Sequence, residues 1–583
     1  MQRAAMVGWY DIRKLGKTAV DVAISAILGM RADYRLLEAL EAEQPVFPYD
    51  NQRDIWIDYV ADTGDGWNPT YSVATLLART SLEASSCHHT GQSHLTQRGQ
   101  ILVMGGDEVY PSASREAYQT RLVGPYECAL EQTPEPHPHL FAIPGNHDWY
   151  DGLVAFTRLF CQERWVGGWL TKQCRSYFAL KLPSHWWLLW TDIQLESDID
   201  QPQLDYFRRV AEEMKPGDGV ILCTAVPDWI YGNIYDKKLE NTLAFLEQNV
   251  IEKAGAKVMV TLAGDLHHYR HHQSNGASKI HKITAGGGGA FLHPTHGPKV
   301  DGITIGPQGK QTAFTLKAEF PSRQRSRWLA LRNIFFPILN PYFGILTGLA
   351  YLMLAWSLQG ALKSTFQETP LIWGNTGEVV QQTLRGLAST PSSVAWVVAL
   401  VVGFIFFTDT HSKPYRYIAG SLHALAHLLL NLALGWWVTR MTIHTLHLTP
   451  DSPGQIIGGA AGLFVGGYLA GSLLMGFYLL VSLNIFGRHA NEAFSSLRIQ
   501  GYKNFLRLYI DTSGRLTIYS FGIKTVPKAW VAAPHPGPSD PKLLPKGNKT
   551  IEACLIEEPI EVLPPWLAQR GREEVNTING KSS

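Results

Sequence analysis

Three segments of this sequence, ADTGDG (61–66), GGDEVY (105–110) and PGNHD (144–148), place Asp or Asn beside glycine directly after an apolar run. A fourth segment, AGDLHHY (263–269), follows the same pattern. The carboxyl ends of strands in an α/β protein meet at one edge of the sheet, so we expect these side chains to form one site. The apolar runs, which have the length and composition of buried strands, are Ile55–Ala61, Ile101–Met104, Leu140–Ile143 and Lys257–Leu262.

The polar residues of these segments are suited to metal binding. Asp, Asn and His side chains supply the donors that Mn, Fe, Mg and Zn accept. Two metals about 3.5–4 Å apart need a bridging carboxylate. Asp107 is the natural bridge, because the glycine before it permits close backbone approach. Each segment alone is a weak signal, but three in order, each after a strand, are specific.

The rest of the chain before residue 320 also alternates strands and helices. Two helical stretches repeat apolar residues at three- and four-residue spacing, and further apolar runs are typical of buried strands. The fold class is therefore α/β. The helices are expected at Pro202–Met214 and Leu239–Ala254, and the strands at Trp186–Trp190, Val220–Cys223 and Lys279–Thr284.

Composition separates a soluble part from a membrane part. The 583 residues include 51 basic and 50 acidic side chains, a net charge of +1, which excludes a nucleic-acid partner attracted by a whole-chain field. Mean hydropathy is -0.07, but charges are sparse from about 332 to 487. That region contains four stretches able to cross a bilayer core of roughly 30 Å. They are about Ile334–Ser357, Val394–Thr408, Ile418–Val438 and Ile456–Phe486.

The flanks of these stretches predict their orientation. Basic residues cluster before the first, between the second and third, and after the fourth, so the positive-inside rule places both termini in the cytoplasm. The six cysteines are scattered without a CxxC pair, which favours a reducing compartment over a disulfide framework. We expect a multi-pass membrane protein whose soluble region and C-terminus are cytoplasmic.

Two features of the spans invite a functional interpretation. His423, His427 and Asn431 form one polar face of the third span, which we interpret as interhelical hydrogen bonding, with a metal or haem ligand pair as the alternative. Small residues recur along the fourth span, so we expect close packing in a bundle or a homo-oligomer. They are Gly458, Gly462, Gly466, Gly467 and Gly471.

Five regions follow from these patterns. LRLYID (506–511) and LTIYSFGI (516–523), joined by TSGR, predict a hairpin in a separate small β-rich unit. The N-terminus lacks the pattern of a signal peptide and predicts an amphipathic helix. The regions are 1–50 (amphipathic), 51–325 (α/β domain), 326–487 (about four transmembrane helices), 488–535 (β-rich cytoplasmic unit) and 536–583 (disordered tail).

The motif set resembles the calcineurin-like metallophosphoesterase superfamily, and its DxG and GDxxY forms are most similar to the purple acid phosphatase branch. The resemblance covers about residues 50–300. It implies a four-layer α/β/β/α sandwich that binds two divalent or mixed-valence metal ions (Mn, Fe, Mg or Zn). The ligands of the first metal would be Asp62, Asp107, Tyr110 and His267, all of which are present.

The second metal would take Asp107, Asn146 and two histidines, and here the chain departs from the family pattern. Ala225 stands where the isolated His is expected, and Asp265 stands where the first His of GHxH is expected. Asp265 can bind a hard ion, whereas Ala225 has no donor. Candidate replacement ligands are Asp65, His268, His293 and His296. The last two lie in GGGGAFLHPTH, for which a flexible glycine turn with surface histidines is the alternative interpretation.

The resemblance also assigns a catalytic residue. His147 would face the substrate and protonate the leaving oxygen, with Asp148 orienting it, while a metal-bound hydroxide attacks phosphorus in line. The chain would then be a membrane-anchored phosphoesterase acting on a phosphorylated small molecule or lipid. The alternative is a catalytically weakened metal- or ligand-binding domain that regulates the membrane bundle. A transporter is disfavoured, because no charged residue lies well inside a span.

Overall fold

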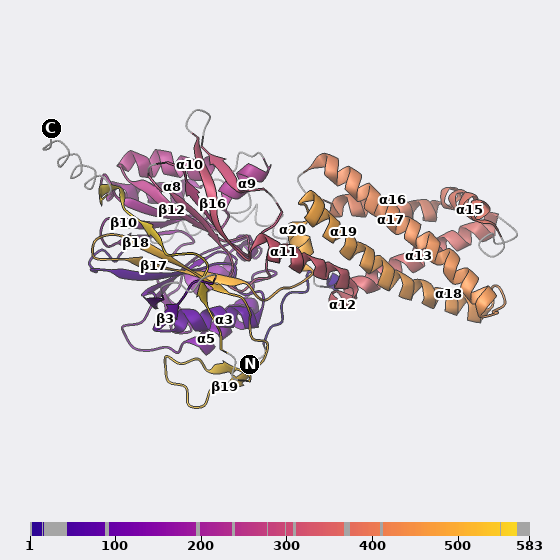
Figure 1. Ribbon diagram of the computed structural model, residues 1–583, viewed down its shortest axis with the longest axis horizontal. Coiled ribbons are helices and arrows are strands. Elements are labelled where there is room, and N and C mark those ends of the chain that lie inside the picture. Colours follow the sequence, from indigo (N-terminus) through magenta and orange to yellow (C-terminus); the bar gives the residue numbers. More distant parts are fainter. Residues whose placement is uncertain are drawn as a thin grey trace. The chain divides into compact units, whose positions relative to one another are not determined.

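The computed structural model describes residues 3–13, 16, 44–87, 93–193, 199–235, 240–276, 278–297, 299–306, 311–365, 374–408, 412–547 and 550–567 (Figure 1). The amphipathic helix expected within region 1–50 lies largely outside these residues. The chain divides into two compact units. Unit 1 comprises Met1–Val7, Lys17–Ser326 and Arg498–Ser583, and unit 2 comprises Gly8–Gly16 and Arg327–Leu497.

Unit 1 contains two nine-stranded sheets among its described residues. Sheet I has the order β1-β9-β10-β11-β12-β14-β13-β16-β15, and its strands are Val46–Pro48, Phe178–Leu182, Trp186–Trp190, Gly219–Cys223, Lys257–Ala263, His281–Ala285, Tyr269–Ser274, Thr312–Phe320 and Gly302–Ile305. Sheet II has the order β21-β18-β17-β2-β5-β6-β8-β7, with β22 also paired to β18, and its strands are Cys554–Leu555, Leu516–Ile523, Lys503–Ile510, Ile55–Val60, Ile101–Gly105, His139–Ile143, Trp169–Thr171, Trp165–Val166 and Ile560–Val562. The seven strands expected from the sequence all form, within a few residues of their predicted ends.

Alternating side chains of these strands enter different cores. In β5, Ile101 and Val103 join a core shared with sheet I, whereas Leu102 and Met104 face a second core beneath helices. On the other face of sheet I, Trp187 and similar residues form a third core with helices. Strands buried on both faces read as continuous apolar runs, which is why the sequence revealed them.

Helices cover the outer faces of both sheets. Figure 1 shows α3 and α5 on one side of the strands and α8 and α10 on the other. Smaller pairs, β3–β4 (Ser81–Ala84, His94–Gln97) and β19–β20 (Trp530–Ala532, Leu543–Pro545), complete the unit. The helices of unit 1 are α3 (Trp67–Ala78), α4 (Arg115–Ala117), η1 (Tyr118–Val123), α5 (Gly124–Ala129), α6 (Asn146–Trp149), α7 (Val154–Phe160), α8 (Gln201–Glu212), α9 (Asp228–Tyr235), α10 (Glu240–Leu246), η2 (Glu247–Ile251) and η3 (Glu252–Ala254).

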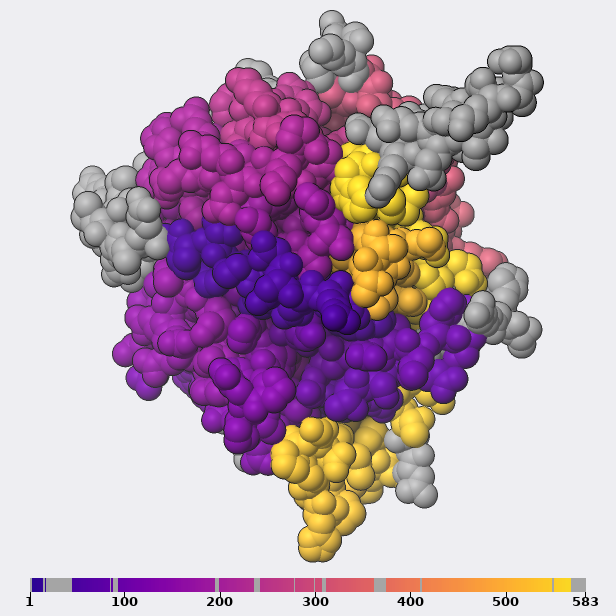
Figure 2. Space-filling model, turned by 90° about the vertical axis from the view of Figure 1, so that its left-hand side faces the viewer, coloured from indigo at the N-terminus to yellow at the C-terminus, as the bar shows by residue number. Residues whose placement is uncertain are grey.

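The hairpin predicted near the C-terminus forms, but it is not a separate unit. β17 pairs antiparallel with β2 from Leu506↔Tyr59 to Ile510↔Ile55, and it pairs with β18 on its other edge. Arg507, fully buried, donates to Asp58 Oδ1 at 2.9 Å. Figure 2 shows these C-terminal residues, in orange and yellow, beside the N-terminal half of unit 1. The expected boundary at 488–535 is therefore wrong, because the apolar faces of the hairpin complete sheet II.

The expectation of a disordered tail from 536 to 583 is also corrected where the tail is described. β20, β21 and β22 lie within it, and residues 568–583 lie outside the described part. Cys87 and Cys554 form a disulfide with a Cα–Cα distance of 5.0 Å, a single bond where the scattered cysteines had favoured a reducing compartment over a disulfide framework. The two cysteines are 467 residues apart in the sequence, so their spacing gave no basis for predicting the disulfide.

Unit 2 is helical, and three of its helical segments are long and apolar enough to cross a membrane: Pro341–Gly360, Lys413–Thr445 and Pro453–Phe486. A fourth candidate is a pair bent by 94°, Thr376–Ser389 with Pro391–Phe407. The first segment begins at Pro341 and not at Ile334. The helices of unit 2, the first of which begins in unit 1, are α11 (Arg323–Ala330), η4 (Leu331–Phe335), α12 (Phe336–Leu339), α13 (Pro341–Thr365), α15 (Thr376–Ser389), α16 (Pro391–Phe407), α17 (Lys413–Arg440), η5 (Met441–Thr445), α18 (Pro453–Gly466), η6 (Gly467–Gly471), α19 (Ser472–Phe486) and α20 (Ala490–Ser495).

The small and polar residues of the spans make contacts within the chain. A Cβ at Gly467 would lie 2.8 Å from Tyr351 Cβ, so glycine permits the close approach of this segment to α13. His427 Nδ1 lies 2.8 Å from the Tyr351 hydroxyl, and His427 Nε2 lies 3.2 Å from His423 Nε2. The interpretation of this face as interhelical hydrogen bonding is confirmed for His427.

The Arg507–Asp58 pair predicts how strongly β17 is held. Replacing Arg507 with Met leaves Asp58 charged and buried, which we expect to lower the free energy of unfolding of unit 1 by about 3–5 kcal/mol. Arg515→Met, which removes an exposed pair with Glu561, should cost less than about 1 kcal/mol. Urea unfolding of the detergent-solubilised chain measures both. Equal free energies of unfolding for the two variants would show that the Arg507–Asp58 pair does not hold β17 in sheet II.

Candidate functional site

Three acidic residues follow strand ends in a strained backbone conformation. Asp62 after β2, Asp107 after β5 and Asp265 after β12 have φ of 57°, 53° and 63°. Positive φ is uncommon for residues other than glycine, although Asp tolerates it better than most. Such outliers concentrate at functional sites, where the surrounding structure fixes a side chain in a required direction. The shared conformation turns all three carboxylates toward one edge.

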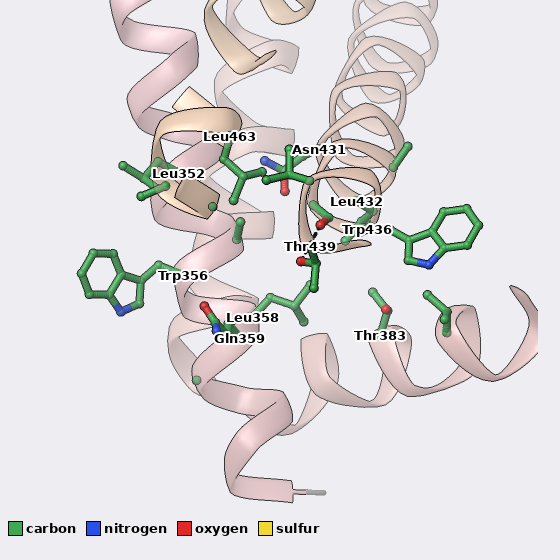
Figure 3. Close-up of a pocket in the computed structure, with 18 of the residues that line it drawn as sticks. Leu352, Trp356, Leu358, Gln359, Thr383, Asn431, Leu432, Trp436, Thr439 and Leu463 are labelled. Carbon is green, nitrogen blue, oxygen red and sulfur yellow. Dashed lines mark hydrogen bonds between the residues drawn. The ribbon is translucent and has the colours of Figure 1, made fainter. Parts of the chain in front are cut away.

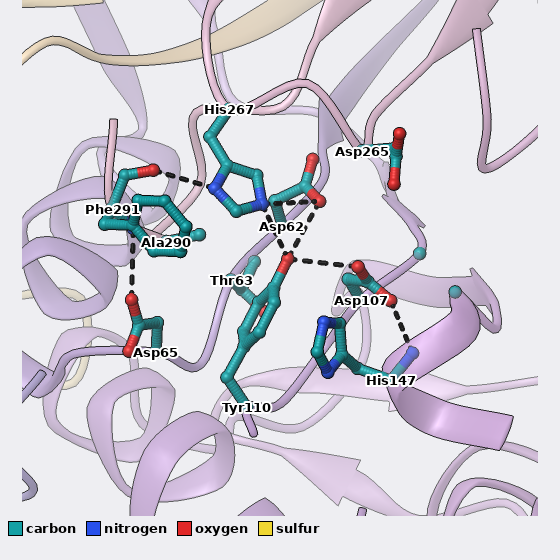
Figure 4. Close-up of polar contacts among 12 residues, drawn as sticks. Asp62, Thr63, Asp65, Asp107, Tyr110, His147, Asp265, His267, Ala290 and Phe291 are labelled. Atoms are coloured by element: carbon teal, nitrogen blue, oxygen red, sulfur yellow. Dashed lines mark hydrogen bonds and ion pairs between the residues drawn. The ribbon is translucent and has the colours of Figure 1, made fainter. Parts of the chain in front are cut away.

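Tyr110 is the point on which the predicted first-metal residues converge (Figure 4). Its hydroxyl oxygen lies 3.0 Å from Asp62 Oδ1, 3.1 Å from Asp107 Oδ2 and 3.0 Å from His267 Nε2. Asp62 Oδ1 and His267 Nε2 are 3.6 Å apart. All four side chains are buried. The structure therefore brings together the whole ligand set expected for the first metal.

The protons available to this group are too few for its acceptors. His267 Nδ1 lies 2.7 Å from the Phe291 carbonyl, which only accepts, so Nδ1 carries the proton of the neutral ring and Nε2 accepts. When Asp62 and Asp107 are both ionised, the Tyr110 hydroxyl has one proton for three acceptors. Asp62 Oδ2, also buried, has no hydrogen-bond partner. A cation would satisfy these atoms.

The spacing of the donors also fits a metal ion. Donors about 2.0–2.2 Å from a metal lie roughly 3.0–3.4 Å from one another in octahedral or tetrahedral arrangements, which matches the 3.0–3.6 Å observed. Within the described residues, no group of three or more His, Cys, Asp and Glu could hold a metal ion by itself. Asp62, Asp107 and His267 are therefore not such a group on their own, and the Tyr110 phenol is the additional donor that a metal ion here would need.

Glycine lets the backbone approach these carboxylates. A Cβ at Gly145 would lie 2.0 Å from Asp107 Oδ1, and one at Gly286 would lie 2.2 Å from Asp62 Oδ2. Neither position has room for a side chain. The GGGG segment, which also read as a flexible turn, is instead packed under the site.

Burial and mutual repulsion dominate the electrostatics of the site. Burial, followed by the charges of Asp107 and Asp265, raises the pKa of Asp62 well above its usual value. Burial, followed by the Asp265 charge, raises the pKa of Asp107 to about 7. Burial lowers the pKa of His267 well below its usual value, so the ring is neutral. Carboxylates crowded in this way are stabilised as anions by a bound cation.

His147 lies beside this group, but its orienting partner differs from the expected one. Its backbone N–H donates to Asp107 Oδ1 at 2.9 Å, and its ring Nδ1 lies 2.6 Å from the Pro111 carbonyl. Asp148 instead accepts from the backbone N–H groups of Gly145 and Glu108 and from the Tyr118 hydroxyl. The expected role of Asp148 is therefore corrected: it fixes the loop, and Pro111 orients the imidazole.

The residues expected for the second metal are less tightly grouped. Asn146 donates to the Tyr150 hydroxyl at 3.0 Å, and Asp265 accepts from the Tyr231 hydroxyl. Ala225 is buried and packs against Gly106, beside Asp107, so a side chain there would face the site. Position 225 therefore lies next to the residue before Asp107, and its alanine supplies no donor.

Two of the four candidate replacement ligands, Asp65 and His296, make other polar contacts. Asp65 accepts from the backbone N–H groups of Val7 and Phe291, so it anchors the N-terminal segment. His296 Nδ1 lies 2.7 Å from the Ser326 hydroxyl. His268 is buried. His293 stacks on His267 with ring centroids 3.9 Å apart, and so contacts one of the residues expected to bind the first metal.

Two residues beside the site were not anticipated from the sequence. Tyr231 extends from α9 to Asp265, and Lys503, at the start of β17, donates to the Ala290 carbonyl while fully buried. Burial lowers the pKa of Lys503 to about 7. Tyr231 could have been suspected from the sequence, because it is an aromatic residue six positions after Ala225, where the family pattern has a histidine. Lys503 could not, because only the long-range pairing of β17 brings it here.

Comparisons with known proteins add little. No protein-family model and no curated protein matches the chain. A solved structure titled "GAP50 the anchor in the inner membrane complex of Plasmodium" is similar over 45% of this chain and 78% of that one, with 13% identity and a TM-score of 0.30. The "Structure of PhoD" is similar over 41% of this chain and 57% of that one, with 10% identity and a TM-score of 0.27. Likenesses this weak carry no argument about function.

The convergence on Tyr110 predicts metal content. Tyr110→Phe removes the central donor, so we expect the affinity for Mn or Fe to fall about 10–100-fold, as measured by elemental analysis after equilibrium dialysis of the full chain. Tyr509→Phe, whose hydroxyl donates to Asp54 on unit 1, is the matched control and should retain wild-type metal. Unchanged binding in Tyr110→Phe would show that the phenol is not a ligand.

Proposed function

We propose that this chain is a membrane-attached, metal-dependent phosphoesterase of the calcineurin-like type. The single observation that carries the proposal is the Tyr110 hydroxyl, which lies 3.0–3.1 Å from Asp62, Asp107 and His267. These residue types, in this order along the chain, match the motifs that suggested the activity. The two sheets with a shared core, and helices on their outer faces, support the four-layer sandwich of that superfamily.

Two metal ions would be held by different parts of the site. The first would take Asp62, Asp107, Tyr110 and His267, and the second Asp107, Asn146 and Asp265. Bound metal ions would supply Lewis-acid stabilisation of the charge that develops on the phosphoryl group. Asp107 suits the bridging role because its two oxygens point apart, Oδ2 toward Tyr110 and Oδ1 toward the His147 backbone. With Ala225 in place of a histidine, the second ion would be the more weakly bound.

His147 is the residue proposed to move a proton. Its Nδ1 donates to the Pro111 carbonyl, which fixes the tautomer and makes Nε2 the atom that exchanges a proton with the leaving oxygen. Its ring lies 4.4 Å from that of Tyr110, centroid to centroid, and so beside the metal ligands. General acid catalysis of this kind contributes roughly 10²–10⁴-fold.

The substrate class follows from the attachment to a membrane region. Apolar helices able to span a bilayer would tether the chain to a membrane, so we propose a phosphorylated small molecule or a lipid phosphate as substrate, and no nucleic acid. The pairing within sheet II also supports an even number of membrane crossings. Because β2 and β17 pair, the chain must leave and re-enter unit 1 on the same side of the membrane, which favours four crossings over three, with the bent pair as one.

Loss of the bridging carboxylate should abolish hydrolysis. In the full chain, needed because β17 and β18 complete sheet II, Asp107→Asn should lower kcat/KM for a chromogenic phosphomonoester or phosphodiester by at least about 10³-fold with Mn added. His147→Ala should lower kcat by roughly 10²–10⁴-fold without changing metal content. Asp205→Asn, on the exposed face of α8, is the control and should retain activity.

The alternative function, a metal- or ligand-binding regulatory domain, rests on Ala225 and Asp265. It predicts one bound metal per chain and no turnover with any added metal. Activity lost in Asp107→Asn but not in Asp205→Asn excludes it, whereas one bound metal per chain and no turnover of the wild-type chain with any added metal would replace the enzyme proposal.

We place unit 1 on the cytoplasmic side, as the basic flanks of the spans favour. Disulfides persist mainly in oxidising compartments, so Cys87 and Cys554 should then be thiols in the cell and should pair on purification. Maleimide labelling of permeabilised cells without reductant should modify both, with the exposed Cys174 as the internal control. Modification of Cys174 but not of Cys87 and Cys554 until reductant is added would reverse the orientation.

A further inference from the structure

Unit 2 contains a cavity of about 520 Å³ between α13, α15, α17 and α18 (Figure 3). Leu352, Leu432 and Leu463 contribute to its walls from three different helices. Small-molecule sites in proteins typically measure roughly 300–1,000 Å³. The cavity is therefore large enough for a ligand and belongs wholly to the helical unit.

The lining of the cavity restricts the charge of an occupant. Among the residues that line it, Asp451 is the one charged side chain, and there is no Lys, Arg or His. A phosphate or carboxylate group in an apolar cavity needs cations or several N–H donors. The walls of this cavity are mostly Leu, Ile, Val, Ala and Gly, with Trp356 and Trp436. An uncharged molecule with a hydrocarbon portion suits such walls.

Asn431 supplies a specific polar contact. Its side chain is buried, and its Nδ2 donates to the Tyr351 carbonyl at 2.9 Å, which fixes the orientation of the amide because a carbonyl only accepts. The other end of the amide, Oδ1, is buried without a hydrogen-bond partner. Asn431 lines the cavity, so a ligand hydroxyl could donate to this oxygen.

A hydrogen bond between Tyr351 and His427 stabilises the position of Asn431. The Tyr351 hydroxyl lies 2.8 Å from His427 Nδ1, so α13 and α17 are joined next to the carbonyl that orients Asn431. The cavity also occupies the later part of α13 and the first part of α18. These are the span ends remote from Arg327 and Leu497, where the chain enters and leaves unit 2.

We propose that this cavity binds an uncharged lipid with one hydrocarbon chain and a hydroxyl headgroup, whose hydroxyl donates to Asn431 Oδ1. The apolar walls take the chain, and the unpaired acceptor selects the hydroxyl. The cavity belongs to unit 2 and the residues around Tyr110 to unit 1, so its occupancy can be measured whether or not the chain hydrolyses phosphate esters.

Photolabelling of the full chain in detergent tests the proposal. The probe is a 1-monoacylglycerol with a diazirine in its acyl chain, and mass spectrometry maps the labelled peptides. Gly459 lines the cavity, and an added Cβ would meet only Gln455 Nε2 at 3.8 Å, so position 459 has room for a Cβ and Gly459→Leu is chosen to fill the cavity. Gly435→Leu, which also lines the cavity with open space around it, is a second filling variant. Gly403→Leu, exposed on α16 with nothing within 4 Å, is the matched control.

The expected result is labelling of α13, α17 and α18 in the wild type and in Gly403→Leu, reduced at least about tenfold in both filling variants. Asn431→Leu should weaken binding of the hydroxyl probe about tenfold, as for the loss of one buried hydrogen bond, while binding of a probe whose hydroxyls are methylated stays unchanged. Equal labelling of Gly459→Leu, Gly435→Leu and Gly403→Leu would overturn the proposal, as would preferential labelling by the same chain ending in phosphate.

Discussion

The antiparallel pairing of β17 with β2 is the contact on which the rest of unit 1 depends. It joins residues about 450 positions apart, adds β18 to sheet II and carries Arg507 into a buried pair with Asp58. Unpaired buried charges are costly, so the Arg507 guanidinium and the Asp58 carboxylate require each other. The helices of unit 2 are therefore inserted in the sequence between two paired strands of sheet II. Unit 1 is complete only when the chain after these helices has added β17 and β18.

The same pairing also supports the candidate site. β2 ends beside Asp62, and β17 begins with Lys503 and Asn504, which lie against the glycine segment under the site. Asp62 and Asp107 then crowd with Tyr110 and His267, with more acceptors than protons to satisfy them. Burial raises the pKa of both carboxylates, and a cation is the simplest group that stabilises them as anions. The positive φ of Asp62, Asp107 and Asp265 is consistent with a site in which the protein fixes the carboxylates in position for a ligand.

Local pattern was enough to predict the strands and the first-metal residues. Ile101–Met104 and its counterparts are continuous apolar runs because both of their faces are buried, and the polar residues that follow them converge for that reason. Long-range partners left no local signal. Neither the pairing of Cys87 with Cys554 nor the position of Lys503 can be inferred from neighbouring residues. The family resemblance assigned Asp148 to orient His147, but the motif does not determine which acceptor the imidazole meets, and here that acceptor is the Pro111 carbonyl.

The central claim is that Tyr110, Asp62, Asp107 and His267 hold a metal ion. Anomalous diffraction from crystals of the full chain grown with Mn tests it most directly. The account predicts a peak among Tyr110 Oη, Asp62 Oδ1, Asp107 Oδ2 and His267 Nε2, with a weaker second peak on the side of Asp107 Oδ1 near Asn146 and Asp265. A map without a peak at the first position, or with manganese bound only elsewhere, would contradict it.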